Sequence, residues 1–253
     1  MCSINVIENY RKIEERVKLA CENSGRNLND VTIIAVSKTK PDEMVRELAG
    51  IGVRDFGENK PQELMRKHDE ILIDEIAGVK SCADGEKLHW HMIGNLQTNK
   101  VKMVVGRAVL IHSVPSLHVA KAISKQADKI APFDVHILIE VNIADEETKH
   151  GAKDSDIYGL VKEIAALPHI VIDGLMAICP PVDNPEDNRI YFRRLRQMRD
   201  EIRNLAKEDG LKNVPMNELS MGMTGDFEVA IEEGATYIRV GTAIFGERDY
   251  LQK

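Results

Sequence analysis

The amino-acid sequence predicts an α/β fold, a single (β/α)8 barrel of the TIM type with an extra N-terminal helix. Apolar strand-like segments alternate with helix-like segments, which implies βαβ units and a parallel sheet. Eight such units use the whole chain of 253 residues, and that length suits a barrel. No shift in composition marks a second domain, so residues 1–253 are expected to form one domain. An open doubly wound sheet is the main alternative.

The predicted elements follow one another in a regular order. An amphipathic helix opens the chain at about residues 4–24. Apolar strand-like segments are expected at 32–38, 55–59, 88–94, 109–114, 133–142, 172–178, 218–223 and 237–246. Helices are expected between them at 41–52, 60–75, 99–107, 116–130, 155–167, 185–210 and 226–235. The most loop-like stretches, 79–89 and 180–188, are too short to be linkers between domains.

Composition and charge exclude several classes of protein. The net charge of -7 and the pI of about 5.7 argue against a broad surface for nucleic acid or an anionic membrane. No apolar run approaches the roughly 20 residues of a membrane helix, and the N-terminus lacks a signal-peptide core. We therefore expect a cytoplasmic protein, and a monomer, because no element has an obviously uncovered apolar face. Widely spaced cysteines without a CxxC pattern indicate reduced thiols: Cys2, Cys21, Cys82 and Cys179.

The barrel prediction places function at the carboxyl ends of the strands. Those ends are unusually polar in this sequence. They carry Lys38, Glu58, Asn59, His91, Asn95, Ser113, Asn142, Met176, Cys179, residues 220–224, Gly241 and Thr242.

Lys38 is the first candidate for chemistry. Strand alternation puts Ile34, Val36 and Lys38 on one face. If that face is the barrel interior, the ammonium enters a partly desolvated mouth. Desolvation and a nearby cation, for which Lys40 is suited, both lower the pKa of a lysine. A neutral lysine forms Schiff bases with carbonyls. The alternative is that Lys38 extends past the rim into water.

A phosphate site is the second candidate. Residues 220–234 combine two glycines, Ser220 and Thr224 ahead of a helix, and the eighth strand carries Gly241 and Thr242. Barrels often bind phosphate in the loops after strands seven and eight, with backbone amides at a helix start. The alternative is a capped helix in which glycine serves a tight turn. A lysine that can react with a carbonyl, next to a phosphate-binding site, suggests two kinds of protein. One is a Schiff-base aldolase acting on a sugar phosphate, and the other is a pyridoxal phosphate protein.

Other candidates have simpler interpretations. His89 and His91 share a strand face at a spacing that suits a metal, but no obvious further ligand completes the set. The basic run at 193–203 is interleaved with acidic residues and is typical of a solvated helix face. Cys179 is expected to be a buried structural cysteine rather than a reactive thiol.

Eight motifs follow one another in order along nearly the whole chain. They are AVSKTKP (35–41), FGEN (56–59), HWHMIGNLQTNK (89–100), HSVPS (112–116), VNIADEETKHG (141–151), GLMAI (174–178), LSMGMTGDF (219–227) and RVGTAIFGERDY (239–250). Together they resemble the pyridoxal phosphate homeostasis protein family, the single-domain relatives of the alanine racemase N-terminal barrel.

The resemblance implies a barrel of pyridoxal phosphate fold type III and a set of site residues. Lys38 would hold the cofactor as a reversible aldimine, and Arg239 would face the pyridine nitrogen. Thr224 stands where serine is more usual, but the hydroxyl is kept. The other implied contacts are Ser220, Thr224, Gly241 and Thr242 for the phosphate, and Asn59, His91 and Asn142 lining the pocket. No metal and no catalytic residue are implied.

Arg239 also limits the chemistry that we expect. Arginine stays protonated and only donates hydrogen bonds, so the pyridine nitrogen that it faces stays unprotonated. That weakens the ring as an electron sink. A two-base racemase also needs a second acid or base, and the barrel is expected to use up the chain. These features favour binding and delivery of pyridoxal phosphate over turnover. The resemblance implies the same, namely a protein of vitamin B6 homeostasis that passes the cofactor to apo enzymes.

The main alternative is an amino-acid racemase that uses Tyr191 or Cys179 as its second base. A lysine aldolase is the least favoured of the three functions.

Overall fold

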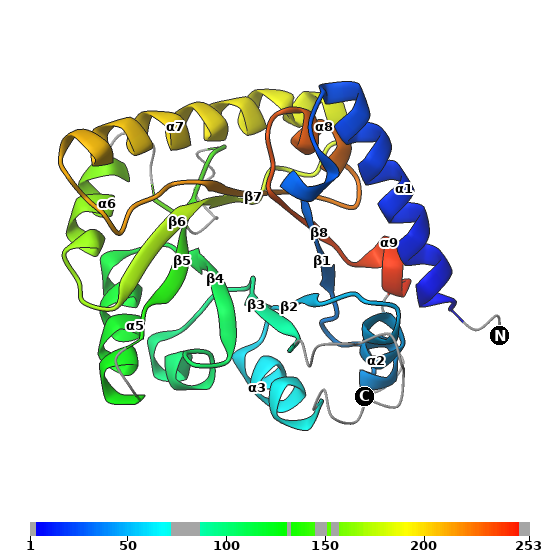
Figure 1. Ribbon diagram of the computed structural model, residues 1–253, viewed down its shortest axis with the longest axis horizontal. Coiled ribbons are helices and arrows are strands. Elements are labelled where there is room, and N and C mark those ends of the chain that lie inside the picture. The colour runs from blue at the N-terminus through cyan, green and yellow to red at the C-terminus, as the bar shows by residue number, and fades with distance from the viewer. Residues whose placement is uncertain (1–3, 72–86, 131–132, 145–150, 153–156, 248–253) are drawn as a thin grey trace.

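Eight parallel strands close into one barrel in the order of the chain, and β8 pairs with β1 (Figure 1). The computed structural model describes residues 4–71, 87–130, 133–144, 151–152 and 157–247. The predicted barrel is thus confirmed, and the open sheet is excluded by the β1–β8 pairing. The strands are β1 (Thr32–Val36), β2 (Asp55–Glu58), β3 (His89–Met92), β4 (Ala108–Val114), β5 (Val135–Val141), β6 (Ile170–Ala177), β7 (Glu218–Met223) and β8 (Tyr237–Val240).

Helices surround the barrel on the outside (Figure 1). The α-helices are α1 (Val6–Ser24), α2 (Asp42–Gly50), α3 (Pro61–Glu70), α5 (Leu117–Ile130), α6 (Ile157–Ala165), α7 (Arg189–Glu208), α8 (Phe227–Glu232) and α9 (Thr242–Phe245). The 3-10 helices are η1 (Leu28–Asp30), η2 (Thr98–Met103) and η4 (Pro185–Asn188). Most of the predicted loop at 79–89, and the end of the helix predicted at 60–75, lie outside the described residues.

Two predicted elements differ from the structure. The helix expected at 99–107 is the shorter 3-10 helix η2, and Gly106, with a left-handed φ of 87°, interrupts the segment before its predicted end. The last predicted strand, 237–246, ends at Val240 and turns at Gly241 into α9. Gly241 and Thr242 therefore belong to a helix start rather than to the strand itself.

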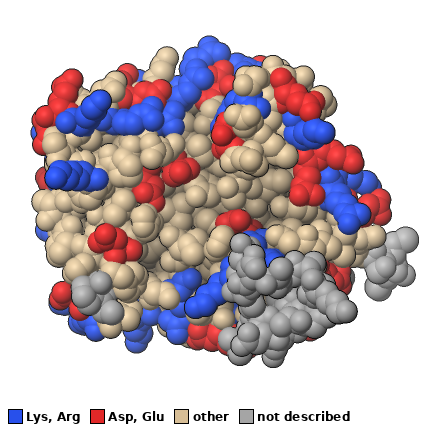
Figure 2. Space-filling model, viewed as in Figure 1, with Lys and Arg blue, Asp and Glu red and all other residues tan. Residues whose placement is uncertain are grey.

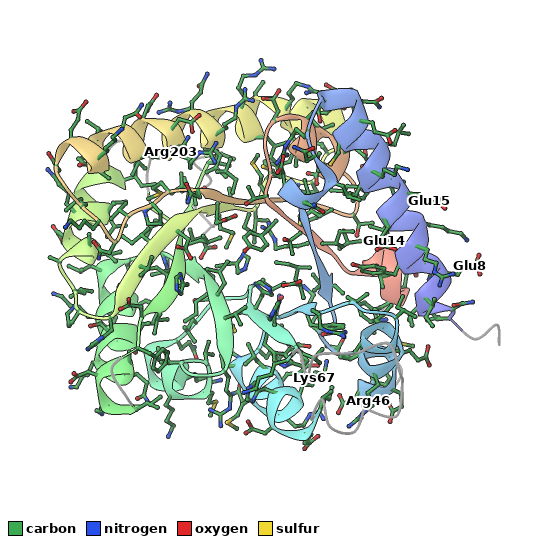
Figure 3. The ribbon with its side chains drawn as sticks, in the orientation of Figure 1. Glu8, Glu14, Glu15, Arg46, Lys67 and Arg203 are labelled. Carbon is green, nitrogen blue, oxygen red and sulfur yellow. The ribbon has the colours of Figure 1, made fainter. Side chains whose placement is uncertain are left out.

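The predicted N-terminal helix is confirmed as α1, which packs outside the barrel against α8 and α9. Its buried residues recur at helical spacing, as in Val6, Tyr10, Ile13 and Val17. The side chain of Asn5 caps its first turn by accepting a hydrogen bond from the Glu8 amide (3.0 Å). Glu8 and Glu15, which are labelled on α1 in Figure 3, point away from the barrel.

The basic run on α7 is more than a solvated face. Arg189, Arg193 and Arg196 all contact the carboxylate of Glu233, just beyond α8, at 3.2, 2.8 and 3.1 Å. That carboxylate is only 5% exposed. Several of these arginines thus serve to join α7 to α8. On the face in Figure 2, basic and acidic side chains are intermixed around the edge.

Apolar side chains pack on both sides of the sheet. The main core lies between the strands and the surrounding helices. Two small clusters fill the barrel interior, and Tyr237 packs against both of them. One consists of Ile34, Val36 and Ile93, and the other of Leu110, Leu138 and Met176.

Gly174 allows β6 and β7 to approach each other closely. A Cβ atom at this position would overlap the carbonyl oxygen of Glu218 on the neighbouring strand. Because that obstacle is backbone, it moves only if the two strands separate. Gly50, at the end of α2, provides a comparison, because a Cβ atom there would meet only open space.

We expect Gly174→Ala to lower the free energy of unfolding by about 1–3 kcal/mol, the usual effect of overpacking. Urea denaturation followed by circular dichroism measures this change. Gly50→Ala is the matched control and should be neutral or slightly stabilising, since alanine favours helix. Equal stability of the Gly174→Ala variant and the wild type would contradict the close approach of β6 and β7.

Candidate functional site

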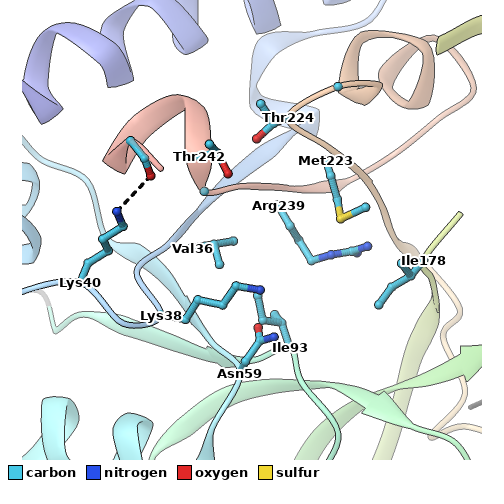
Figure 4. Close-up of a pocket in the computed structure, with 13 residues that line it drawn as sticks. Val36, Lys38, Lys40, Asn59, Ile93, Ile178, Met223, Thr224, Arg239 and Thr242 are labelled. Carbon is cyan, nitrogen blue, oxygen red and sulfur yellow. Dashed lines mark hydrogen bonds between the residues drawn. The ribbon is translucent and has the colours of Figure 1, made fainter. Parts of the chain in front are cut away.

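A cavity of about 310 Å³ opens at the carboxyl ends of the strands (Figure 4). Its volume is within the range of small-molecule sites, about 300–1,000 Å³. Three of its lining residues are basic, and none of the lining residues in the described ranges is acidic. The lining consists of Val36, Lys38, Lys40, Asn59, Ile93, Ile178, Met223, Thr224, Gly225, Arg239, Gly241, Thr242 and Gly246.

Lys38 lies just after the end of β1. Ile34 and Val36 of the same strand point into the barrel interior, as alternation predicts. The chain then turns, with the amide of Lys40 donating to the carbonyl of Ser37 (3.0 Å). Figure 4 shows the Lys38 side chain directed into the cavity, toward the same space as Arg239.

A buried ion pair holds the turn that carries Lys38. Lys67 on α3 (labelled in Figure 3) and Glu58 at the end of β2 are fully buried and lie 2.8 Å apart. The Lys67 ammonium also donates to the carbonyl of Ser37 (2.7 Å) and contacts Glu63 (3.0 Å). The backbone amide of Thr39 donates to the same Glu63 carboxylate (2.7 Å). The residues on both sides of Lys38 are thereby fixed.

Glu58 is a buried acid close to a basic cavity, and its charge state depends on its neighbours. Burial raises the pKa of Glu58, and Lys67 acts against that rise. The Ser37 hydroxyl donates to one carboxylate oxygen (2.7 Å), and the other oxygen has no hydrogen-bond partner among the described residues. Since a buried carboxylate is stable only when it is paired, the Glu58 charge depends on Lys67.

Lys40 has a different role from Lys38. Its ammonium donates to the carbonyl oxygens of Phe245 (2.9 Å), Gly246 (3.0 Å) and Glu247 (2.8 Å), at the end of α9. Three N–H groups thus meet three carbonyls. Lys40 fixes α9 against β1, and Figure 4 shows one of these bonds as a dashed line.

The opposite wall is formed by the segments after β7 and β8. Thr224 and Gly225 belong to a turn that Asp226 closes by accepting from the Met223 amide (2.7 Å). Gly222 precedes this turn with φ of 88°, and a Cβ there would lie 2.6 Å from the Cβ of Ala230. Glycine is therefore required where the chain leaves β7.

Arg239 of β8 forms the floor of the cavity. Its guanidinium donates to the Ser220 hydroxyl (2.5 Å) and to the carbonyl of Ala177 (2.9 Å). Burial lowers the pKa of Arg239 to about 10, with Cys179, Asp226 and Glu140 acting in the opposite direction. The guanidinium therefore stays charged at neutral pH.

Below Arg239, polar side chains continue through the barrel interior. The Ser220 hydroxyl lies 2.8 Å from Nδ1 of His112, whose Nε2 lies 3.0 Å from Nδ1 of His91. Nε2 of His91 lies 3.0 Å from a carboxylate oxygen of Asp55, to which His89 is also hydrogen-bonded. These contacts occupy both ring nitrogens of His91 and of His112.

The structure brings together most of the residues predicted for the site. Lys38, Asn59, Thr224, Arg239, Gly241 and Thr242 line the cavity. Ser220, His91 and Asn142 are not among the lining residues: Ser220 lies behind Arg239, and His91 is deeper in the barrel. The amide of Asn142 donates to the carbonyl of Ala152 (3.1 Å), which places it at the end of β5.

Two residues considered as reactive groups lie outside the cavity lining. Cys179 is buried in the main core, and Tyr191 packs against that core from α7. Within the described residues no group of three or more histidine, cysteine, aspartate or glutamate side chains is placed to hold a metal ion. In the same part of the chain, no helix is long and apolar enough to span a membrane.

Sequence reasoning missed the supporting residues Lys67, Asp55 and His112. Lys67 follows Glu63 by one helical turn, which is typical of an exposed ion pair, so no local signal indicated its burial. His112 could have been found from the sequence, because it is a polar residue within the otherwise apolar strand segment VLIHSV.

Comparison with protein families gives a match over nearly the whole chain. The family model described as "Alanine racemase, N-terminal domain" matches residues 9–249. The "Pyridoxal phosphate homeostasis protein" of Aquifex aeolicus is 42% identical over 247 residues, covering 98% of this chain and 100% of that protein. The protein of the same name from Pseudomonas aeruginosa is 36% identical, covering 97% of this chain and 96% of its own length.

Solved structures show the same fold. PipY of Synechococcus elongatus, with PLP bound, is 32% identical with a TM-score of 0.74, covering 92% of this chain and 100% of PipY. An alanine racemase of Clostridium difficile has a TM-score of 0.65 at 14% identity, covering 98% of this chain but 58% of the racemase. At that identity the racemase shows the likeness of fold alone.

We expect Lys67→Met to lower the free energy of unfolding by about 3–5 kcal/mol, because it leaves the Glu58 carboxylate buried without its cation. Chemical denaturation measures the change. Adding Glu58→Gln to Lys67→Met should restore part of the loss, since it removes the unpaired charge. Lys102→Met, at an exposed lysine, is the control and should change stability by no more than about 0.5 kcal/mol. If Lys67→Met lowered the free energy of unfolding by less than about 1 kcal/mol, the Lys67–Glu58 pair would be no stronger than an exposed salt bridge, and its proposed importance would be contradicted.

Proposed function

Because this chain belongs to the pyridoxal phosphate homeostasis protein family, whose barrel matches the alanine racemase N-terminal domain, we propose that it holds pyridoxal phosphate in the cavity at Lys38. The protein acts in vitamin B6 balance and passes the cofactor to apo enzymes, as a monomer and without catalytic turnover. The observation that carries this proposal is the cavity itself. It combines a lysine just after β1 with a basic lining that has no acidic side chain in the part of the chain that the structure describes.

The lining fits the cofactor in charge and size. Lys38, Lys40 and Arg239 surround the cavity, and its described lining has no carboxylate to repel a phosphate dianion. This local excess of positive charge occurs in a chain of net charge -7, so it is specific to the site. The volume of about 310 Å³ suits one small molecule.

The phosphate is assigned to the wall opposite Lys38. Thr224 and Thr242 supply hydroxyl groups, and Gly225 and Gly241 leave their backbone accessible. A Cβ at Gly241 would lie 3.3 Å from the Cβ of Val36, so glycine keeps this wall clear. Lys40 supports the same wall, because it fixes α9 through the carbonyls that follow Ile244.

Lys38 is assigned the covalent anchor. Pyridoxal phosphate supplies an aldehyde that condenses reversibly with an amine. The Lys38 side chain points into the cavity, and the Lys67 network fixes the backbone before and after it. A Schiff base at Lys38 Nζ therefore forms at one defined place.

Arg239 opposes catalysis in the same site. Its pKa of about 10 keeps it protonated at neutral pH, and a guanidinium donates hydrogen bonds only. A pyridine nitrogen that accepts from Arg239 stays unprotonated, and the ring then withdraws electrons weakly. Binding is favoured over carbanion chemistry.

The lining also offers no suitable second acid or base. Apart from Lys38, its titratable side chains in the described residues are Lys40 and Arg239, and Lys40 is engaged by three carbonyls. Tyr191 and Cys179 do not line the cavity. The racemase alternative therefore lacks a second base within the described lining.

Borohydride reduction of the protein loaded with pyridoxal phosphate, followed by peptide mass mapping, tests the anchor. We expect a phosphopyridoxyl group on Lys38 alone, and none in Lys38→Ala. Lys60→Ala, at an exposed lysine nearby, is the control and should keep the adduct at Lys38. An adduct spread over surface lysines, or no adduct in the wild type, would overturn the assignment.

The same variant tests the absence of turnover. Wild-type protein, Lys38→Ala and free pyridoxal phosphate are incubated with single amino-acid enantiomers, and loss of optical purity is followed by chiral chromatography. We expect the wild type to match free pyridoxal phosphate. Turnover well above that level and dependent on Lys38 would favour a racemase instead.

A further inference from the structure

An unbroken chain of hydrogen bonds connects the floor of the cavity to the opposite end of the barrel. It runs from Arg239 to Ser220 (2.5 Å), His112 (2.8 Å), His91 (3.0 Å) and Asp55 (3.0 Å). Five strands contribute one residue each, namely β8, β7, β4, β3 and β2. All of these residues are buried except Asp55, whose side chain is 26% exposed at the start of β2.

The chemistry of the two ends determines the direction of the bonds at those ends. At one end Arg239 only donates, so the Ser220 oxygen accepts from it, and at the other end the Asp55 carboxylate only accepts, so Nε2 of His91 donates. Burial lowers the pKa of His112 well below its ordinary value, so the ring is neutral and carries one hydrogen. We assign that hydrogen to Nε2, where it is donated to Nδ1 of His91, and the Ser220 hydroxyl then donates to Nδ1 of His112.

The same logic continues to Asp55. Since Nδ1 of His91 accepts from His112, the ring donates from Nε2 to the Asp55 carboxylate. Burial raises the pKa of Asp55, but its hydrogen bonds with His89 and His91 outweigh this and lower it to about 2. Asp55 is therefore an ionised acceptor at neutral pH, and the chain runs from a cation to an anion.

Packing holds the two rings in this arrangement. The His91 and His112 rings meet edge-on, with centroids 5.1 Å apart, and Tyr237 lies against both at 5.6 and 5.5 Å. Tyr237 also packs against both apolar clusters of the interior. The hydrogen bonds thus lie in a confined, weakly polar space, where each one strengthens its neighbours.

We propose that Asp55, His91, His112 and Ser220 form a positioning relay that aims the Arg239 guanidinium into the cavity, with its direction set by the Asp55 carboxylate at the far end of the barrel. This proposal rests on the proposed function, because it assigns to Arg239 the contact with the pyridine ring. The relay residues act through Arg239 and do not themselves line the cavity.

The first experiment needs no cofactor. We use 15N-histidine NMR of the wild-type protein without ligand at neutral pH. We expect a hydrogen on Nε2 and an accepting Nδ1 in both His91 and His112. A hydrogen on Nδ1 of either ring would overturn the relay, whether or not the protein binds pyridoxal phosphate.

The second experiment interrupts the relay at its far end. Asp55→Leu removes the last acceptor while leaving the cavity lining intact. We expect it to weaken pyridoxal phosphate binding by about three- to tenfold, as for one misaligned hydrogen bond at Arg239, and to shift the absorption maximum of the bound cofactor. Asp55→Asn keeps an acceptor and should restore most of the affinity.

Asp173→Leu is the matched control for this experiment. Asp173 is a second carboxylate that is mostly buried, 19% exposed, near the start of β6, where it bonds to His136 outside the relay. It should leave the affinity and the absorption maximum unchanged. An Asp55→Leu variant that binds and absorbs like the wild type would overturn the proposal, as would equal effects of the two leucine variants.

The two proposals fail in different ways. Loss of the Lys38 adduct in the wild type would refute the proposed function and leave the NMR result to decide the relay. A Lys38 adduct with wild-type spectra in Asp55→Leu would refute the relay alone.

Discussion

The ion pair between Lys67 and Glu58 is the interaction on which the site depends. It lies between β2 and α3, outside the barrel, yet it reaches the backbone of β1 through Ser37. A strand end exposed at a barrel mouth has few packing partners of its own. Here the buried charged groups provide the contacts that hold the backbone on both sides of Lys38, and this fixes the direction of the Lys38 side chain. Because each charge in the pair compensates the other, the arrangement is stable only as a unit.

Lys38, Lys40 and Lys67 show how position decides the use of a single side-chain type. The burial of Lys67 is compensated by two carboxylates and a carbonyl. Lys40 binds three carbonyls at the end of α9. Lys38, just beyond the end of β1, points into the cavity. Lys40 and Lys67, which stabilise the fold, thus lie close in the structure to Lys38, the lysine assigned to ligand binding.

Much of the fold, and several residues at the cavity, could be predicted from the sequence. Periodicity located the strands, and β7 was predicted with its observed bounds. Alternation correctly placed Ile34 and Val36 on the inner face, but Lys38, which was predicted on the same strand, lies in the turn beyond the end of β1. Which inward-pointing side chains contact one another across the barrel could not be predicted. The strand register is irregular at Trp90/His91 and at Ser220/Met223, and these shifts change which residues of neighbouring strands lie at the same height along the barrel axis. Contacts such as His112 with Ser220 depend on those offsets, and no local pattern records them.

The contacts of Lys40 with α9 also have a consequence for biosynthesis. The cavity is built from segments near residue 40 and near residue 245, and β1 finds its second neighbour only in β8. A chain emerging from the ribosome therefore displays Lys38 long before the opposite wall exists. Such long-range closure folds slowly compared with local helices. The cavity therefore forms only after the segment near residue 245 has been synthesised and has packed against β1, and a shorter nascent chain lacks the wall needed to hold a ligand.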